Sequence, residues 1–345
     1  MYKGFLFMVT PFVPLQHQVA GHNGSMQSVD GSLFCKAAKH REIKFYNDSH
    51  GKMMDPSDSL ALGSLLIDWM PVYLGTLDPG LSDELSSKKS DIVDGNQNTL
   101  GKVGQNETFL VLENVLYGYR KPNIMDIKLG NILYDETADK AKVERMKEVS
   151  RSTTSGSLSF RICGVQISDD FHGELPASIE NCKMEDVCHR KPDGYLTFDK
   201  RFGRSLTETS VRDALRLFFR GNCLAKVIQD KIVDNFVIRL QTLYNCLLDT
   251  EVRIISGSLL FVLEDDEQRW KDMEYEDPVL EERLIDDSDD EEEEEEEGGG
   301  GSIISSSLSC LKFIDFAHAR YTPGEGYDEG LIKGVENLLK LMADI

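Results

Sequence analysis

The sequence predicts a mixed α+β fold in which short strands and long amphipathic helices share one core. After Pro122, the residues Ile124, Asp126 and Lys128 alternate with Met125, Ile127 and Leu129, which predicts a strand with one polar and one apolar face. Phe109–Leu112 is an apolar run typical of a short buried strand. Lys226–Leu248 instead repeats apolar residues at helical spacing, which predicts a long helix with one buried face. A hydrophobic fraction of 40% over 345 residues allows two average domains or one bilobal domain.

The N-terminal part of the chain predicts a leader, a hairpin and a helix. Residues 1–16 are expected to be a leader that either adds a strand or stays disordered, because two prolines interrupt its apolar run and no cleavage pattern follows. Strands are expected at 18–22 and 32–36 around a polar turn at 23–31, and a helix is expected from Arg41. Residues 65–74 are expected to form a core strand or turn. Residues 78–106 lose periodicity and predict a disordered insert.

The elements downstream of residue 130 alternate between charged and apolar patterns. We expect a charged helix over 138–149, a strand over 160–167, a loop over 169–193 and helices over 210–220 and 226–248. A strand over 254–263 should pair with one over 311–316, and a helix over 327–345 should close the chain. Residues 264–310 contain an acidic run and four consecutive glycines, so we expect a solvated loop there.

Charge and cysteine usage exclude several classes of protein. The net charge is −22, and 11 acidic residues lie in the run 286–297. The rest of the chain is still acidic, so direct binding to nucleic acid or to anionic membranes is not expected. No apolar run is long enough for a transmembrane segment. Seven scattered cysteines, an odd number, indicate a reducing compartment.

Asp126 and Lys128 are the first candidates for chemistry. They lie two residues apart in the predicted strand, so their side chains point to the same face. The acid can accept a hydroxyl proton or hold a sugar hydroxyl, and the base can neutralise phosphate charge. This spacing taken alone favours a surface ion pair on an edge strand.

The longer pattern around this pair, Pro122-x-x-x-Asp126-x-Lys128-x-Gly130, resembles the inositol polyphosphate kinase family. Leu112–Val115, Ser258–Phe261 and Ile314–His318 resemble other motifs of that family, in the same order. The resemblance runs from about His17 to the C-terminus, interrupted by variable inserts, and is strongest to the fungal multikinases. It implies a bilobal kinase-like fold: a small antiparallel-sheet lobe (17–113, with the insert 78–106) and a larger α/β lobe (114–345, with the insert 264–310) that holds the inositol site.

The resemblance also implies an activity and a set of site residues. The activity is ATP- and Mg²⁺-dependent phosphorylation of inositol 1,4,5-trisphosphate to tetrakis- and pentakisphosphate at the 6- and 3-hydroxyls, together with phosphorylation of phosphoinositide lipid. Catalysis is assigned to Asp126 and Lys128. The nucleotide residues are Lys36, Glu42, Glu113, Val115, Asp126, Ser258 and Asp315, of which Asp315 and Ser258 also hold the metal. The substrate residues are Lys128, Arg145, Lys147, Lys200 and His318.

Some of these residues have a plainer explanation in the sequence itself. Lys36 also fits a solvated strand lysine, and Arg145 and Lys147 also fit the exposed face of a charged helix. Gly257 stands where the family has a serine, so no role is carried over to that position and an inactive relative remains an alternative.

Two other hypotheses stay open at this point. The first is a scaffold whose acidic run binds basic protein partners. Fungal multikinases as a group are linked to nuclear transcription complexes, so we expect this chain in the nucleus and cytoplasm. The second is a hexakisphosphate kinase or a dedicated trisphosphate 3-kinase, which differs only in its acceptor. No Walker-type phosphate loop occurs in the sequence, which disfavours a P-loop kinase.

Overall fold

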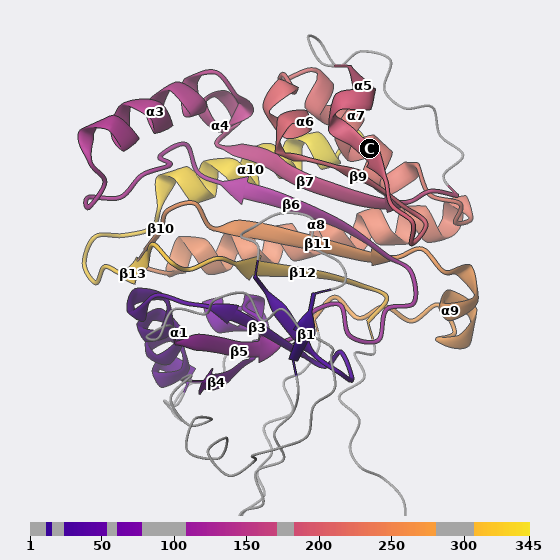
Figure 1. Ribbon diagram of the computed structural model, residues 1–345, viewed down its shortest axis with the longest axis horizontal. Helices are drawn as coiled ribbons and strands as arrows, with labels where there is room; N and C mark the ends of the chain where they lie inside the picture. The colour runs from indigo at the N-terminus through magenta and orange to yellow at the C-terminus, as the bar shows by residue number, and fades with distance from the viewer. Residues whose placement is uncertain (1–11, 16–23, 54–60, 78–107, 171–182, 281–306) are drawn as a thin grey trace, which may run out of the picture.

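The computed structural model describes residues 12–15, 24–53, 61–77, 108–170, 183–280 and 307–345. Within these residues the strands form a five-stranded sheet (the small sheet), a six-stranded sheet (the large sheet) and a two-stranded ribbon. Figure 1 shows the small sheet and helix α1 below the β12 edge of the large sheet, and helices behind and above the large sheet. The predicted mixture of helices and strands is confirmed.

The small sheet is antiparallel, with the order β1-β2-β3-β5-β4. Its elements are β1 Phe12–Pro14, β2 Met26–Ser28, β3 Leu33–Ala37, β4 Tyr73–Leu77 and β5 Phe109–Glu113, with α1 His40–Met53 and the 3₁₀ helix η1 Leu66–Trp69 alongside. The predicted strand at 109–112 and the helix from Arg41 are confirmed.

One expectation for the N-terminal hairpin is wrong. The polar turn expected at 23–31 contains strand β2, and the true turn spans only 29–32. Asp30 accepts hydrogen bonds from the Ser28 and Ser32 hydroxyls, and these contacts close a tight turn. Residues 12–14 of the expected leader form β1 and pair with β2. The rest of that leader, the expected strand at 18–22 and the insert 78–106 lie wholly or mainly outside the described residues.

The large sheet has the order β12-β11-β6-β7-β9-β8. Its strands are β6 Pro122–Leu129, β7 Phe160–Ser168, β8 Cys188–Arg190, β9 Tyr195–Phe198, β11 Ser258–Glu264 and β12 Ser309–Ile314, and the ribbon pairs β10 Val252–Ile254 with β13 Ala319–Tyr321. Strand β6 lies between β11 and β7, so it is an interior strand. The interpretation of Asp126 and Lys128 as an ion pair on an edge strand is therefore wrong.

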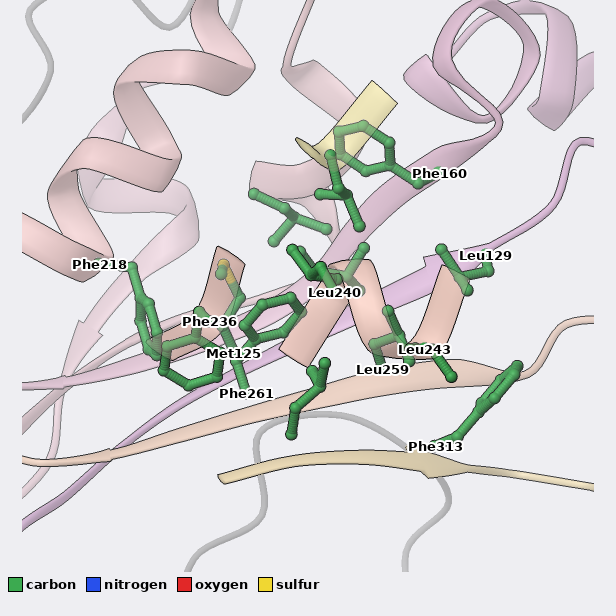
Figure 2. Close-up of a cluster of buried hydrophobic side chains, with 14 of the residues drawn as sticks. Met125, Leu129, Phe160, Phe218, Phe236, Leu240, Leu243, Leu259, Phe261 and Phe313 are labelled. Atoms are coloured by element: carbon green, nitrogen blue, oxygen red, sulfur yellow. The ribbon is translucent and has the colours of Figure 1, made fainter. Parts of the chain in front are cut away.

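Helices cover one face of the large sheet and leave the catalytic candidates on the other. The remaining helices are α3 Lys140–Arg151, α4 Thr154–Leu158, α5 Met184–Val187, α6 Lys200–Ser205, α7 Ser210–Arg220, α8 Lys226–Asp249, α9 Glu267–Asp272 and α10 Glu329–Met342. Figure 2 shows side chains of α8 among those of the sheet, including Phe236, Leu240, Met125, Leu259 and Phe261. Met125, Ile127 and Leu129 are fully buried, as the alternation in β6 predicts. None of the described helices has the length and apolar character that a membrane span requires.

Two expected boundaries in the second half of the chain are wrong. The expected strand over 254–263 is two strands in different sheets, because Ser256 adopts a left-handed conformation (φ 63°) and breaks the extended chain. The expected loop over 169–193 contains α5 and β8, where Val187 is buried against the core.

The acidic insert is narrower than the range 264–310 that the sequence predicts. Glu264 ends β11 and forms a buried ion pair of 2.9 Å with Arg269 of α9, and Trp270 of α9 is fully buried. Asp277 then accepts hydrogen bonds from the backbone N–H groups of Leu308 and Ser309, which joins the two ends of the insert. Residues 281–306, including the acidic run, lie outside the described residues. The change from the small to the large sheet falls between residues 113 and 122, and the division into lobes at 113/114 stays a prediction.

Gly203 provides a test of how tightly helix α6 lies on the large sheet. A Cβ atom at Gly203 would lie 1.7 Å from the carbonyl oxygen of Ile162 in β7, and that oxygen belongs to backbone that cannot rotate away. We expect Gly203→Ala to lower the free energy of unfolding by about 3 kcal/mol or more, measured by urea denaturation. Gly51→Ala in α1 is the matched control: nothing lies within 4 Å of its Cβ position, so a gain of about 0.5–1 kcal/mol is expected. Equal effects at both positions would contradict this packing.

Candidate active site

Asp126, Lys128, Ser258 and Asp315 lie close together on the face of the large sheet opposite α8. Lys128 in β6 is the cross-strand neighbour of Ser258 in β11, and Ser258 is that of Ile314 in β12. Asp315 follows Ile314 directly. Because adjacent strands are about 4.8 Å apart, Asp315 lies within about two strand spacings of Lys128. Residues more than a hundred positions apart in the sequence thus form one polar cluster.

Asp126 is buried, at 6% exposure, and its surroundings favour the protonated form. Burial raises the pKa of Asp126 to about 6, with a further contribution from the negative charge of Asp315. The charge of Lys128, the nearby Ser258 hydroxyl and the charge of Arg161 act in the opposite direction. The Ser258 hydroxyl is near enough to lower the pKa of Asp126, but within the described residues neither Asp126 Oδ1 nor Ser258 Oγ makes a hydrogen bond of good geometry. Such buried atoms cost roughly 1–3 kcal/mol each, so these two are suited to contacting a ligand.

Lys36 links the small sheet to the end of β12. Its Nζ lies 2.8 Å from Glu42 Oε1 on α1 and 2.9 Å from Asp315 Oδ1. Burial alone would lower the pKa of Lys36, but the charges of Asp315 and Glu42 outweigh this and raise it. The side chain is 18% exposed, so the alternative of a solvated strand lysine is wrong.

The backbone at Asp315 is turned out of the strand. Asp315 has φ +67°, in the left-handed region that aspartate tolerates better than most side chains. Glu42 Oε1 also accepts a hydrogen bond of 3.2 Å from the backbone N–H of Phe316, which holds the turn against α1. The Asp315 side chain remains 41% exposed beside the buried Asp126. A carboxylate that is partly exposed and held by the Lys36 ammonium group can contact a metal ion together with phosphate oxygens.

Lys128 and His318 are also held by specific contacts. Lys128 Nζ donates to the carbonyl oxygen of Ser256 at 2.8 Å. His318 Nδ1 lies 2.6 Å from Asp135 Oδ2, an arrangement in which Nδ1–H donates and Nε2 is left for a substrate. Burial would raise the pKa of Asp135, but hydrogen bonds from Thr137 and His318 outweigh it and hold the pKa at about 2. Arg41 NH1 of α1 contacts the same carboxylate at 3.1 Å.

The remaining predicted residues make no hydrogen bond or ion pair with this cluster within the described part of the chain. Arg145 and Lys147 are exposed on α3, where Lys147 pairs with Glu144, and Lys200 is exposed at the start of α6. Figure 1 shows α3 and α6 above β7, on the side of the large sheet away from β12. Glu113 ends β5, where its N–H donates to Val72 and its side chain lies 3.3 Å from Lys312 of β12, and Val115 is half-buried just after it.

Comparisons with known proteins decide the family. The family model described as inositol polyphosphate kinase matches residues 109–343, more than half of the chain. The inositol polyphosphate multikinase of Saccharomyces cerevisiae is 42% identical over 95% of this chain and 96% of its own length. This chain belongs to the inositol polyphosphate kinase family. The multikinase of Schizosaccharomyces pombe is 26% identical, over 94% of this chain and 95% of its own length.

A solved structure supports the fold assignment of this family member. The crystal structure of an inositol phosphate multikinase from S. cerevisiae in complex with ADP and Mn²⁺ matches with a TM-score of 0.67 and 37% identity. It covers 91% of this chain and 99% of the solved chain. The kinase-like α+β fold that the motifs imply is therefore confirmed, and the family is one of phosphotransferases.

The donor set of this inositol polyphosphate kinase fits a nucleotide and a divalent cation. Asp315 supplies a carboxylate oxygen, and Ser258 Oγ and Asp126 Oδ1 are buried polar atoms without hydrogen-bond partners among the described residues. In the part of the chain that the structure describes, no group of three or more His, Cys, Asp or Glu could hold a metal ion alone. The residues thus fit a cation that shares its ligands with phosphate oxygens.

Sequence reasoning missed several residues of the cluster. Asp135 and Arg41 were not singled out, since the contact of Asp135 with His318 spans 183 positions and no local pattern marks it. Arg161 and Cys163 were interpreted only as part of a strand, although Arg161 is the cross-strand neighbour of Lys128. A charged residue in the otherwise apolar strand 160–167 was the one signal that could have found it.

The structure also explains the departure at Gly257. A Cβ atom there would lie 2.5 Å from Ile254 and 2.8 Å from Phe313, while the Gly257 carbonyl accepts a hydrogen bond from Leu129. Packing thus favours glycine, and Ser258 keeps its place beside Lys128.

The raised pKa of Asp126 makes stability depend on pH at this site. Because the folded-state pKa is about 6 against an ordinary 3.8, the contribution of Asp126 to stability is fully present below pH 3.8 and is lost as pH rises through 6. Asparagine is neutral throughout, so Asp126→Asn should stabilise the protein by about 2–3 kcal/mol at pH 8 and have no such benefit at pH 4. Urea denaturation in EDTA measures this, with the exposed Glu208→Gln as control. A variant less stable than wild type at pH 8 would contradict the burial argument.

Proposed function

We propose that this chain transfers the terminal phosphoryl group of ATP to inositol 1,4,5-trisphosphate and its tetrakisphosphate product, at the 6- and 3-hydroxyls. Its similarity to the multikinases of S. cerevisiae and S. pombe supports multikinase chemistry. One observation carries the proposal: Lys36 forms ion pairs with both Glu42 and Asp315. These ion pairs lie next to Lys128 and its cross-strand neighbour Ser258. This arrangement combines cationic and anionic groups where a nucleotide's phosphates and a polyanionic acceptor must meet.

The nucleotide would lie between the two sheets. Because the Glu113 N–H is already bonded to Val72, Glu113 would offer its carbonyl oxygen to the amino group of adenine, and the backbone of Val115 would follow as the second contact. Lys36 would neutralise phosphate charge from β3 while Glu42 orients its ammonium group. Asp315 and Ser258 would hold Mg²⁺, which supplies charge neutralisation to the phosphates when bound.

The acceptor hydroxyl would approach Asp126 and Lys128. With a pKa of about 6, Asp126 is largely ionised at pH 7 and can hold or accept the hydroxyl proton. Lys128, oriented by the Ser256 carbonyl, would place its charge on the moving phosphoryl group. No covalent intermediate is required, because positioning and charge stabilisation suffice for phosphoryl transfer.

The acceptor's other phosphates would contact basic residues around the cluster. His318 can present Nε2 to the inositol ring, since Asp135 binds Nδ1. Arg145 and Lys147 of α3 and Lys200 of α6 would bind peripheral phosphates, and all three are exposed. The same surface would accept a phosphoinositide lipid headgroup as a second substrate.

Two wider proposals rest on less of the structure. We propose a location in the nucleus and cytoplasm, which the free cysteines Cys35, Cys163, Cys188, Cys223, Cys246 and Cys310 support. The hypothesis that the acidic run binds basic partners concerns residues 286–297, outside the described residues, and stays a prediction.

A product-resolved kinase assay tests the proposed function. Purified protein with ATP, Mg²⁺ and inositol 1,4,5-trisphosphate should give tetrakis- and pentakisphosphate, separated by anion-exchange chromatography. Lys128→Ala should lower kcat/KM by about 10²–10³-fold, because a charge aimed at the moving phosphoryl group is lost. Lys333→Ala on α10, an exposed lysine paired with Glu336, is the control and should stay within about twofold of wild type. If the wild-type protein shows no turnover of inositol 1,4,5-trisphosphate, the proposed function is wrong.

Nucleotide titration with and without Mg²⁺ tests the metal residues independently of turnover. The wild-type protein should bind ADP at least about tenfold more tightly with Mg²⁺ present, because Asp315 shares the cation with phosphate oxygens. Asp315→Asn should lose this gain, and EDTA should abolish turnover of the wild type. If the gain survives in Asp315→Asn, another residue holds the metal.

A further inference from the structure

Arg161 is a buried cation beside the catalytic pair. It is the cross-strand neighbour of Lys128 on β7 and is only 7% exposed. Among the described residues no carboxylate lies within ion-pair distance of it. Its guanidinium instead donates to two hydroxyls, Ser155 Oγ at 3.1 Å and Thr153 Oγ1 at 3.4 Å, and lies 4.0 Å from Cys163 Sγ. A buried charge with neutral partners is costly, and three short polar side chains would not compensate it fully.

A bulge in the sheet sets the geometry at this point. The pairing of β6 with β7 shifts between Asp126, which faces Gly164, and Ile127, which faces Ile162. Cys163 is therefore the extra residue, and the shift leaves Arg161 directly opposite Lys128. Beyond the bulge, β7 extends past the end of β9, so Arg161 lies where helices rather than a strand flank β7.

The two hydroxyls belong to the corner between α3 and α4. Thr153 precedes α4 and its hydroxyl also donates to the Val149 carbonyl of α3 at 2.6 Å, while Ser155 is fully buried in α4. A Cβ atom at Gly156 would lie 2.6 Å from the Ser150 carbonyl, so the corner is compact. Arg161 thus donates its hydrogen bonds to a compact corner between α3 and α4.

Helix α3 depends on polar contacts of this kind for its position. It has no buried residue, so apolar packing does little to place it. Its C-terminal end is held by Ser150 Oγ on the Asn131 carbonyl at 2.7 Å and by the bonds from Arg161 to the α3–α4 corner. A rotation of α3 would displace Arg145 and Lys147, which lie exposed on it.

We infer that Arg161 is a positioning residue that holds the α3–α4 corner, and with it α3, at a fixed distance from Lys128. The inference rests on the proposed function, because Arg145 and Lys147 of α3 are there proposed to bind the acceptor's phosphates. Arg161 then determines affinity for the inositol phosphate and leaves nucleotide binding unaffected, since Lys36 lies on β3 and Asp315 follows β12, two elements that do not contain Arg161.

Two variants separate the bonds made by Arg161 from its charge. Arg161→Met removes both, whereas Thr153→Val combined with Ser155→Ala removes the bonds to the corner and leaves the guanidinium in place. If Arg161 is a positioning residue, both should raise KM for inositol 1,4,5-trisphosphate by about tenfold or more and change KM for ATP by less than about twofold. Arg161→Lys, which can still donate to one hydroxyl, should recover part of the affinity.

Arg220→Met is the matched control. Arg220 is a half-buried arginine of α7 that contacts Asp230 and the Ile345 carbonyl, away from the large sheet's catalytic face. Thermal melts followed by circular dichroism show which variants fold. If Arg161→Met does not fold, the double variant Thr153→Val/Ser155→Ala and the variant Arg161→Lys test the inference instead.

Several outcomes would overturn the inference. If Arg161→Met weakens trisphosphate binding and the hydroxyl double variant does not, Arg161 contacts the substrate itself. If KM for both substrates is unchanged in every variant, or only kcat falls, Arg161 supports the fold and nothing more. Calorimetric titration of trisphosphate without ATP gives the same comparison without turnover. An inactive wild type that still binds trisphosphate would therefore remove the proposed reaction and leave the Arg161 inference open to this test.

Discussion

The register of strand β6 is the constraint on which this site depends. Met125, Ile127 and Leu129 pack against the helical layer, and the alternate residues Asp126 and Lys128 face the other way. Because side chains alternate along a strand, a slip of one residue would move the carboxylate and the ammonium group into the apolar core. The pairing Ser258–Lys128–Arg161 across three strands and the buried α8 interface both hold this register. The apolar core therefore fixes where the charges lie.

Around this strand the molecule concentrates opposite charges in a small, partly buried volume. Asp126, Asp315 and Glu42 are acidic, while Lys36, Lys128 and Arg161 are basic, although the chain as a whole carries a net charge of −22. These acidic and basic side chains come from several strands and α1, and their charges balance one another within the site. Burial, with a further contribution from the charge of Asp315, raises the pKa of Asp126 to about 6 against the opposing charges of Lys128 and Arg161, so that the carboxyl group can exchange a proton near neutral pH. An acidic protein can thus still present a site suited to polyanions.

Much of the fold and part of the site were predictable because they depend on local patterns. The strands 109–113 and 122–129 and the long helix α8 follow from periodicity. The pairing of Lys36 with Glu42 followed from the resemblance and is present in the structure. Features that depend on distant partners were missed. Helix α9, whose Trp270 is fully buried, was predicted as part of an acidic loop, and Arg161 was interpreted only as part of a core strand.

The sequence by itself determined the most regular elements, such as β5, β6 and α8, which side chains of β6 share a face and which family the motifs resemble, because period and spacing are properties of neighbouring residues. The tertiary structure alone decided that β6 is an interior strand, that Asp135 binds His318 across 183 positions and that Arg161 stands beside Lys128. Those facts depend on which strands pair and on where the bulge at Cys163 falls. Strand pairing is settled by the burial of the whole core, and no short stretch of sequence contains that information.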